Sequence, residues 1–201
     1  MRIPHLLLIG LCAWGGWNWS QHRPVSHIPA GIAAADLPEQ GSPRLAPLRV
    51  GAYQLTPLAS FRLQARVLAR EDYRMDKEAD LAPTDLALGW GPMSDPAIYG
   101  QLAISQSRRF YFWRYQDPPP IPPGEIARSS ANMHLIPATP GVRADLSRVR
   151  PGQLVRLEGH LVEARDDSGW RWRSSLTRDD TGAGACELVW VEALAIEPER
   201  P

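Results

Sequence analysis

The sequence predicts a mainly β domain, either a small antiparallel barrel or a sandwich, with one or two short helices and an apolar N-terminal helix ahead of it. Apolar and polar residues alternate over residues 61–68 and again over 102–115, as they do in a half-buried strand. Three further strands are expected at residues 154–162, 170–177 and 186–196, with turn residues between them at intervals of roughly ten residues. Short strands at that spacing are typical of an antiparallel meander.

The chain of 201 residues fits one domain with an appendage, and 44% of its residues are hydrophobic, which is enough to build a core. We expect a signal or membrane anchor at residues 1–20, a Pro/Ala-rich linker at 21–48 and a β-rich globular domain at 49–201. The net charge is zero, with 22 basic and 22 acidic residues. Because a nucleic-acid-binding domain usually carries a basic excess, we do not expect nucleic acid as a partner.

The N-terminal residues have the layout of an export signal. Arg2 is followed by an uncharged apolar run and then by the polar residues 20–23. Residues 3–19 span 17 positions, which is at the lower limit for a membrane-crossing helix of about 20 apolar residues. The distal end of this run carries the tryptophans expected at a membrane interface, namely Trp14, Trp17 and Trp19. We therefore expect an uncleaved transmembrane anchor in the inner membrane, with the soluble domain facing the periplasm or the outside.

Three alternatives remain open for this N-terminal run. It could be the cleaved signal of an exported soluble protein, although no small-x-small cleavage site follows it directly. Cys12 could carry a lipid, but Leu11 directly ahead of it fits a lipoprotein signal poorly. The run could also form a buried N-terminal helix of a cytosolic protein.

Prolines and capping residues suggest how the rest of the chain is divided. Five prolines recur within residues 22–48, so no helical or strand period survives there and we expect a semi-extended linker. Asp80 is a suitable N-cap for a short helix over residues 80–88. A helical turn is expected at residues 125–130, and a short strand at 133–136.

The C-terminal third carries a pattern that resembles an OB-fold barrel. Residues 155–162 read V-x-L-x-G-x-L-V, and a strand, the turn Asp-Asp-Thr-Gly and a further strand follow. The resemblance covers residues 149–191 and implies that Gly159 lies where the first strand of the barrel bends. Because the chain ends before two more strands, the resemblance implies a permuted barrel completed by strands at 60–68 and 102–115.

Two tryptophans alternate with two arginines along one predicted strand, as Trp170, Arg171, Trp172 and Arg173. In OB-folds, which this region resembles, aromatic side chains on such a strand stack on bases or sugars. The other interpretation, which we expect to hold, is that the tryptophans fill the core while the arginines are solvated. Because alternation puts both tryptophans on one face, they should be buried together or exposed together.

A loop and a strand supply the candidate catalytic residues. Trp90 lies between two glycines in an irregular loop, and Ser94 and Asp95 follow it. With His134 as a general base, Ser94 or Asp95 could serve a hydrolase, but no Gly-x-Ser-x-Gly elbow is present. A tight turn with Trp90 filling the core is the simpler interpretation. Asn132 and His134 alternate onto one face, so both could point at a ligand.

Neither a metal site nor a cofactor is expected. The chain has only two cysteines, Cys12 and Cys186, and no His-x-x-x-His pattern adds ligands to His134 and His160. A disulfide is not expected either, because it would pull the anchor onto the domain. The sequence favours a binding or assembly module of the cell envelope, with another envelope protein as a candidate partner, over the alternative of an envelope hydrolase.

Overall fold

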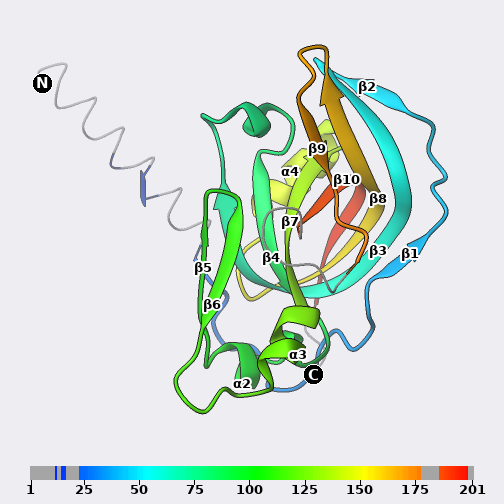
Figure 1. The fold of residues 1–201 in the computed structure, drawn as a ribbon. Helices are drawn as coiled ribbons and strands as arrows, with labels where there is room; N and C mark the ends of the chain where they lie inside the picture. Colours follow the sequence, from blue (N-terminus) through cyan, green and yellow to red (C-terminus); the bar gives the residue numbers. More distant parts are fainter. Residues whose placement is uncertain (1–11, 13–14, 17–22, 178–185, 199–201) are drawn as a thin grey trace, which may run out of the picture.

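The computed structural model describes residues 12, 15–16, 23–177 and 186–198. The expected anchor at residues 3–19 therefore lies almost wholly outside the described residues. Within the described part, no helix has the length and apolar character needed to cross a bilayer. The structure is mainly β, as predicted, and one large sheet with a few short helices makes up most of it (Figure 1).

The longest strand, β3 (Tyr53–Asp72), organises the sheet. It pairs antiparallel with β8 (Leu154–Asp166) up to Arg66, and from Arg66 onward it pairs antiparallel with β4 (Thr84–Gly89). Register shifts between Pro57 and Ala59 and between Val67 and Ala69 break the regular ladder. Such irregularities bend and twist a strand, which allows β3 to serve two neighbours in succession.

The other pairings lead back to β3. Strand β4 pairs antiparallel with β7 (Ser130–Pro137), and β7 pairs parallel with β10 (Glu187–Glu197), which in turn pairs antiparallel with β8. A parallel pair needs a crossover connection, and helix α4 (Pro140–Arg148) lies on the path from β7 through β8 to β10. Three short strands extend the sheet, namely β1 (Glu39–Gly41) and β2 (Leu48–Val50) on β3, and β9 (Arg171–Arg173) on β8.

The main core lies on the inner face of these strands. Alternate residues of β3, including Phe61 and Leu63, pack there with residues of every neighbouring strand. Helix α4 contributes Val142 and Leu146 to the same cluster. The apolar partners from the other strands are Leu86, Leu88, Met133, Leu135, Leu157, Leu161, Val189 and Val191. Polar residues on these strands are consequently left to the outer face.

Three sequence-based assignments are wrong. Residues 102–115 form a hairpin of β5 (Ala103–Ser107) and β6 (Phe110–Arg114), a two-stranded sheet of its own, because continuous alternation does not reveal a two-residue turn. The expected helix at 80–88 is largely β4, whose apolar run is buried on both faces and so has no strand period. Of the expected strand at 170–177, only β9 forms.

Other assignments are confirmed. The expected helical turn at 125–130 corresponds to α3 (Pro123–Arg128), and the short strand at 133–136 lies within β7. The strands expected at 154–162 and 186–196 correspond to β8 and β10.

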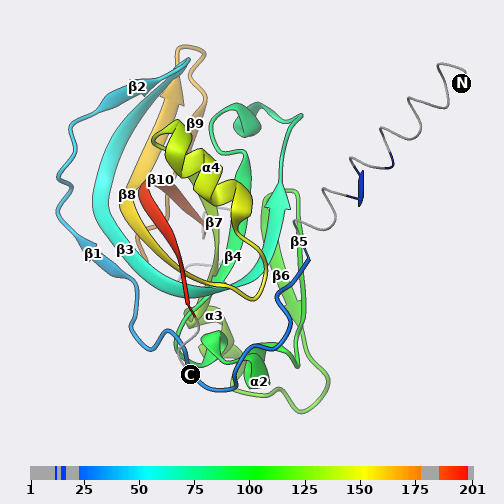
Figure 2. The ribbon, with the colours of Figure 1, turned by 180° about the vertical axis from the view of Figure 1, so that it is seen from behind.

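Part of the segment expected to be a linker lies against the domain. Ala34 is fully buried in the main core, and its carbonyl oxygen accepts a hydrogen bond from the backbone of Gly91. The backbone of Val25 donates to the carbonyl of Pro151. Seen from behind in Figure 2, the segment runs beneath the domain and then continues as β1 and β2 along the outer side of β3.

Gly159 marks the closest approach of two strands. A Cβ atom at this position would lie 1.9 Å from the carbonyl oxygen of Trp190 in β10, well inside van der Waals contact. The ladder shifts register directly opposite, between Val191 and Ala193. The OB-fold resemblance led us to expect this glycine in the first strand, but it lies in β8, which follows β3, β4 and β7 along the chain.

We predict that Gly159→Ala lowers the free energy of unfolding by about 2–3 kcal/mol, because β8 and β10 must separate to admit the methyl group. Urea denaturation, followed by circular dichroism, measures this change in the free energy of unfolding. Gly141→Ala is a suitable control, since its nearest neighbour, the Thr139 hydroxyl, is 3.6 Å away and the site is helical. An equal, small effect of both substitutions would contradict the close approach.

Candidate ligand-binding site

Polar residues gather on the outer face of β4 and β7. Asp85 of β4 lies directly opposite His134 of β7 in the antiparallel register, and Asn132 is two residues before His134 on the same face. Their neighbours in sequence, such as Leu86 and Met133, point into the main core. The prediction that Asn132 and His134 share a face is therefore consistent with the register, although both side chains are buried.

A buried network centres on the carboxylate of Asp85, which is fully inaccessible to solvent. One of its oxygens, Oδ2, lies 2.8 Å from His134 Nδ1 and accepts a hydrogen bond from Asn132 Nδ2 at 3.2 Å. The other, Oδ1, accepts from Arg109 Nη1 at 3.1 Å. A buried carboxylate is costly unless polar partners surround it. Arg109 and Asn132 donate hydrogen bonds to Asp85, and the His134 ring is its third close partner.

Arg109 reaches this network from the tip of the β5–β6 hairpin. Its guanidinium donates two hydrogen bonds to Asp76, at 2.8 and 3.1 Å, and lies 3.9 Å from the ring centroid of Tyr73. It also donates to the carbonyl oxygen of Ala82 at 2.8 Å. The residue has a φ of 70°, and its backbone N–H donates to the Tyr73 hydroxyl at 2.9 Å. These contacts hold the hairpin tip in a conformation that side chains other than glycine rarely adopt.

The pKa values around Arg109 fit this arrangement. Burial and the nearby charge of Asp85 raise the pKa of Tyr73 to about 12, so its hydroxyl stays protonated at neutral pH. Burial would also raise the pKa of Asp76, but the hydrogen bonds and charge of Arg109 outweigh it and hold that pKa below its ordinary value. Asp76 is therefore ionised wherever the domain is folded near neutral pH, and it balances Arg109.

A pocket of about 340 Å³ lies beside the network. The His134 ring forms part of its wall and packs against the Trp172 ring with their centroids 4.7 Å apart. Because Nδ1 of His134 faces Asp85, its Nε2 is the nitrogen left for a ligand. The pocket is lined by residues from several elements, namely Glu78, Arg109, Phe110, His134, Arg171, Trp172, Arg173 and Cys186.

The two tryptophans are alike in exposure, as predicted, but they are partly exposed and not buried as we expected. Trp170 and Trp172 are both partly exposed, and they pack edge to face with centroids 6.0 Å apart. They cover a smaller apolar cluster that includes Leu55 and Val162 rather than the main core. Because β9 is a short edge strand that pairs with β8, Trp172 within it and Trp170 just before it lie at the surface of the sheet.

The arginines of β9 converge on one carboxylate. Glu163 accepts hydrogen bonds from Arg165 at 2.6 Å, from Arg171 at 2.6 and 2.9 Å, and from Arg173 at 2.9 Å. Burial would raise the pKa of Glu163, but the three guanidinium groups outweigh it and lower that pKa to about 2. Among the described residues, three guanidinium groups share one carboxylate here, so this part of the pocket edge carries an excess of positive charge.

The remaining predicted residues lie outside the network. Trp90 is fully buried in the main core, in agreement with the simpler interpretation of its loop. The buried Ser94 hydroxyl donates to the carbonyl of Gly91 at 2.7 Å and accepts from the backbone of Ala33 and Ala34. Asp95 caps the helix α2 (Pro96–Tyr99). Among the described residues, neither Ser94 nor Asp95 forms a hydrogen bond or an ion pair with His134.

Sequence reasoning missed Asp85, Arg109 and Cys186 as site residues. Asp85 had one visible signal, since it is a lone charge in the otherwise apolar run that forms β4. Arg109 had none, because an Arg-Arg pair is not a usual hairpin turn. Cys186 lines the pocket with its sulfur 3.9 Å from the carbonyl oxygen of Arg109. Among the described residues, no cluster of three or more His, Cys, Asp or Glu side chains fits a metal ion.

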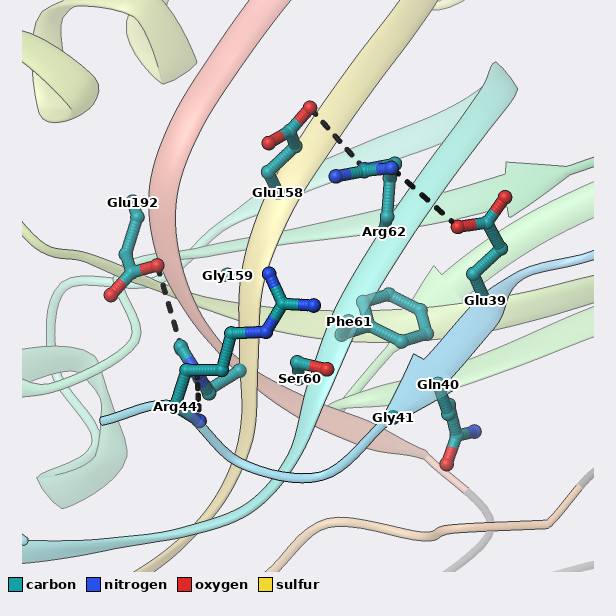
Figure 3. A pocket seen from close by; sticks show the side chains of 11 residues that line it. Glu39, Gln40, Gly41, Arg44, Ser60, Phe61, Arg62, Glu158, Gly159 and Glu192 are labelled. Atoms are coloured by element: carbon teal, nitrogen blue, oxygen red, sulfur yellow. Dashed lines mark hydrogen bonds and ion pairs between the residues drawn. The ribbon is translucent and has the colours of Figure 1, made fainter. Parts of the chain in front are cut away.

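A second pocket, of about 380 Å³, lies between residues 39–44 and the outer side of β3 and β8 (Figure 3). There His160 Nε2 accepts from the backbone N–H of Arg44 at 3.2 Å, and Arg62 lies between Glu39 and Glu158 at 3.6 and 3.4 Å. Figure 3 shows the Arg44 side chain extending toward Gly159. These ion pairs are about half exposed and contribute little. The pocket beside His134 is the better candidate because two of its polar side chains, His134 and Arg109, are largely buried and held by Asp85.

We predict that Glu163 makes stability depend on pH in the acidic range. Its folded pKa of about 2 lies below the ordinary 4.5, so its contribution is complete above pH 4.5 and is lost as the pH falls toward 2. Between neutral pH and pH 2.5, the free energy of unfolding of Glu163→Gln should fall by on the order of 2 kcal/mol less than that of the unaltered protein. Urea unfolding of both proteins between pH 2.5 and 7 measures the difference, and parallel pH profiles would contradict it.

Comparisons with known proteins identify no relatives. No protein-family model matches the chain, and neither the curated proteins nor the solved structures contain a match. What the site does is therefore inferred from its own residues and their geometry.

Proposed function

We propose that the protein is a non-enzymatic binding module whose ligand occupies the pocket beside His134. The observation that carries this proposal is the buried Asp85, which fixes Arg109 and His134 next to the partly exposed ring of Trp172. Groups held in place before binding lose little conformational entropy when a ligand arrives. A pocket of about 340 Å³ with an aromatic wall and a few fixed polar groups has the character of a small-molecule or side-chain site.

We also propose that the strands around β3 make an OB-type barrel. The successive pairs β3–β4, β4–β7, β7–β10, β10–β8 and β8–β3 support this, and they occur without the permutation that we expected. OB-folds bind ligands on the outer face of their second and third strands, between two flanking loops. Here β4 and β7 hold those places. The connection before β4 supplies Glu78, and the connection after β8 supplies Trp172.

We propose that the protein is located in the cell envelope, with residues 3–19 as an anchor in the inner membrane and the domain facing the periplasm or the outside. Its support is the uncharged, tryptophan-ended run of the sequence. The alternative is an exported soluble protein. We propose no hydrolase on Ser94, because its hydroxyl is engaged by backbone groups of Gly91 and Ala34.

We predict that the full-length protein stays in the membrane pellet through a high-salt wash, because burial of an apolar segment is not sensitive to salt. Cell fractionation and immunoblotting measure this. A shorter species in the soluble fraction would instead establish an exported protein with a cleaved signal.

Trp172→Ala tests the binding function itself. We screen fluorinated aromatic and aliphatic fragments by ligand-observed ¹⁹F NMR against the full-length protein in detergent. Fragments that occupy the pocket should lose about tenfold or more in affinity in this variant, because they lose a stacking surface. Tyr115→Ala is the matched control, since Tyr115 is an exposed aromatic residue outside the pocket lining. Unchanged binding of every fragment to Trp172→Ala would contradict the proposed site.

A further inference from the structure

We propose that the ligand of this pocket joins a planar aromatic group to an anionic group, as an aryl carboxylate does. This inference rests on the proposed binding function, and it adds the chemical class of the ligand. Two walls of the pocket support this proposal. One is made of aromatic rings, and the other of arginines that outnumber their carboxylate partners in the described part of the chain.

The aromatic part follows from rings contributed by three different elements. Trp172 of β9 packs against His134 of β7, and Phe110 at the start of β6 lines the same pocket with 39% of its surface exposed. The exposed faces of these rings lose contact with water when another flat apolar group packs on them. An aliphatic chain would cover the same rings less completely.

The anionic part follows from the charges on β9. The side chains of Arg171 and Arg173 are 51% and 46% exposed, and they share Glu163 with Arg165. One carboxylate cannot neutralise three guanidinium groups. Because a guanidinium presents a fork of donors that matches a carboxylate, an incoming anion finds a suitable partner at either exposed arginine.

Arg109 does not share this role, although it lines the pocket. Two carboxylates, from Asp76 and Asp85, already balance its charge, and its side chain is only 12% exposed. It is a positioning residue for the wall. Glu78, by contrast, lines the pocket as an opposing negative charge, so its removal should favour an anionic ligand.

The test compares two near-isosteric probes, 2-naphthoate and 2-naphthamide, by isothermal titration calorimetry on the full-length protein in detergent, with a micelle blank. At low salt, naphthoate should bind at least about tenfold more tightly than naphthamide. This advantage should shrink in about 0.5 M salt, because exposed charges are screened. The salt series uses the unaltered protein and so does not depend on the folding of any variant.

Variants then locate the two halves of the ligand. Arg171→Gln combined with Arg173→Gln should bring naphthoate down to the affinity of naphthamide, whereas Glu78→Gln should strengthen naphthoate alone. Arg114→Gln is the control, since this arginine lies on the hairpin outside the pocket lining. Trp172→Ala should weaken both probes.

Each contrary result has a distinct meaning. Equal affinities for the two probes would contradict the proposal that the ligand carries an anionic group. If Trp172→Ala leaves the affinity for naphthoate unchanged, the proposal that an aromatic group of the ligand packs on Trp172 would be contradicted. If neither probe binds while fluorinated fragments still bind in a Trp172-dependent way, the ligand class is wrong and the binding function stands. If the affinity of those fragments is also unchanged by Trp172→Ala, the proposed binding function itself is contradicted.

Discussion

The burial of one carboxylate, that of Asp85, is the constraint on which the rest of the site depends. A carboxylate without contact to water needs donors around it, and these are Asn132 of the neighbouring strand β7 and Arg109 at the tip of the β5–β6 hairpin. Asp85 therefore fixes the hairpin against the outer face of the sheet. Without it, Arg109 and Asp76 would still pair, and Asn132 would still donate to the Arg109 carbonyl oxygen, but no carboxylate would link the Arg109 guanidinium to the His134 ring.

The same constraint explains how the pocket acquires its shape. The inner face of β4 and β7 is filled by leucines and methionine of the main core, so the polar network can form only on the outer face. The His134 ring beside Asp85 packs against Trp172, and the short strand β9 brings Arg171 and Arg173 to the edge of the pocket. A rigid, polar interior and a partly exposed aromatic wall thus arise from one arrangement.

How much of this could be predicted from the sequence depends on how local each signal is. Alternation placed Asn132 and His134 on one face and located β8 and β10, because strand period is a local property. Alternation could not reveal the hairpin turn at Arg108 and Arg109, where both residues have positive φ without a glycine or asparagine. Asp85 could not be matched to His134 either, since their pairing depends on the register of two strands far apart in the chain.

Asp85→Asn, studied by urea unfolding and by binding of the fluorinated fragments, tests the central claim most directly. The substitution replaces the buried carboxylate, to which Arg109 and Asn132 donate, by an amide whose nitrogen cannot accept a hydrogen bond, so the free energy of unfolding should fall by about 3–5 kcal/mol. The fragments should also bind more weakly, because the variant no longer holds the side chains of His134 and Arg109 in place. Asp76→Asn, at a partly exposed partner of the same arginine, should have the smaller effect. Unfolding within about 1 kcal/mol of the unaltered protein, with unchanged fragment affinity, would contradict the account.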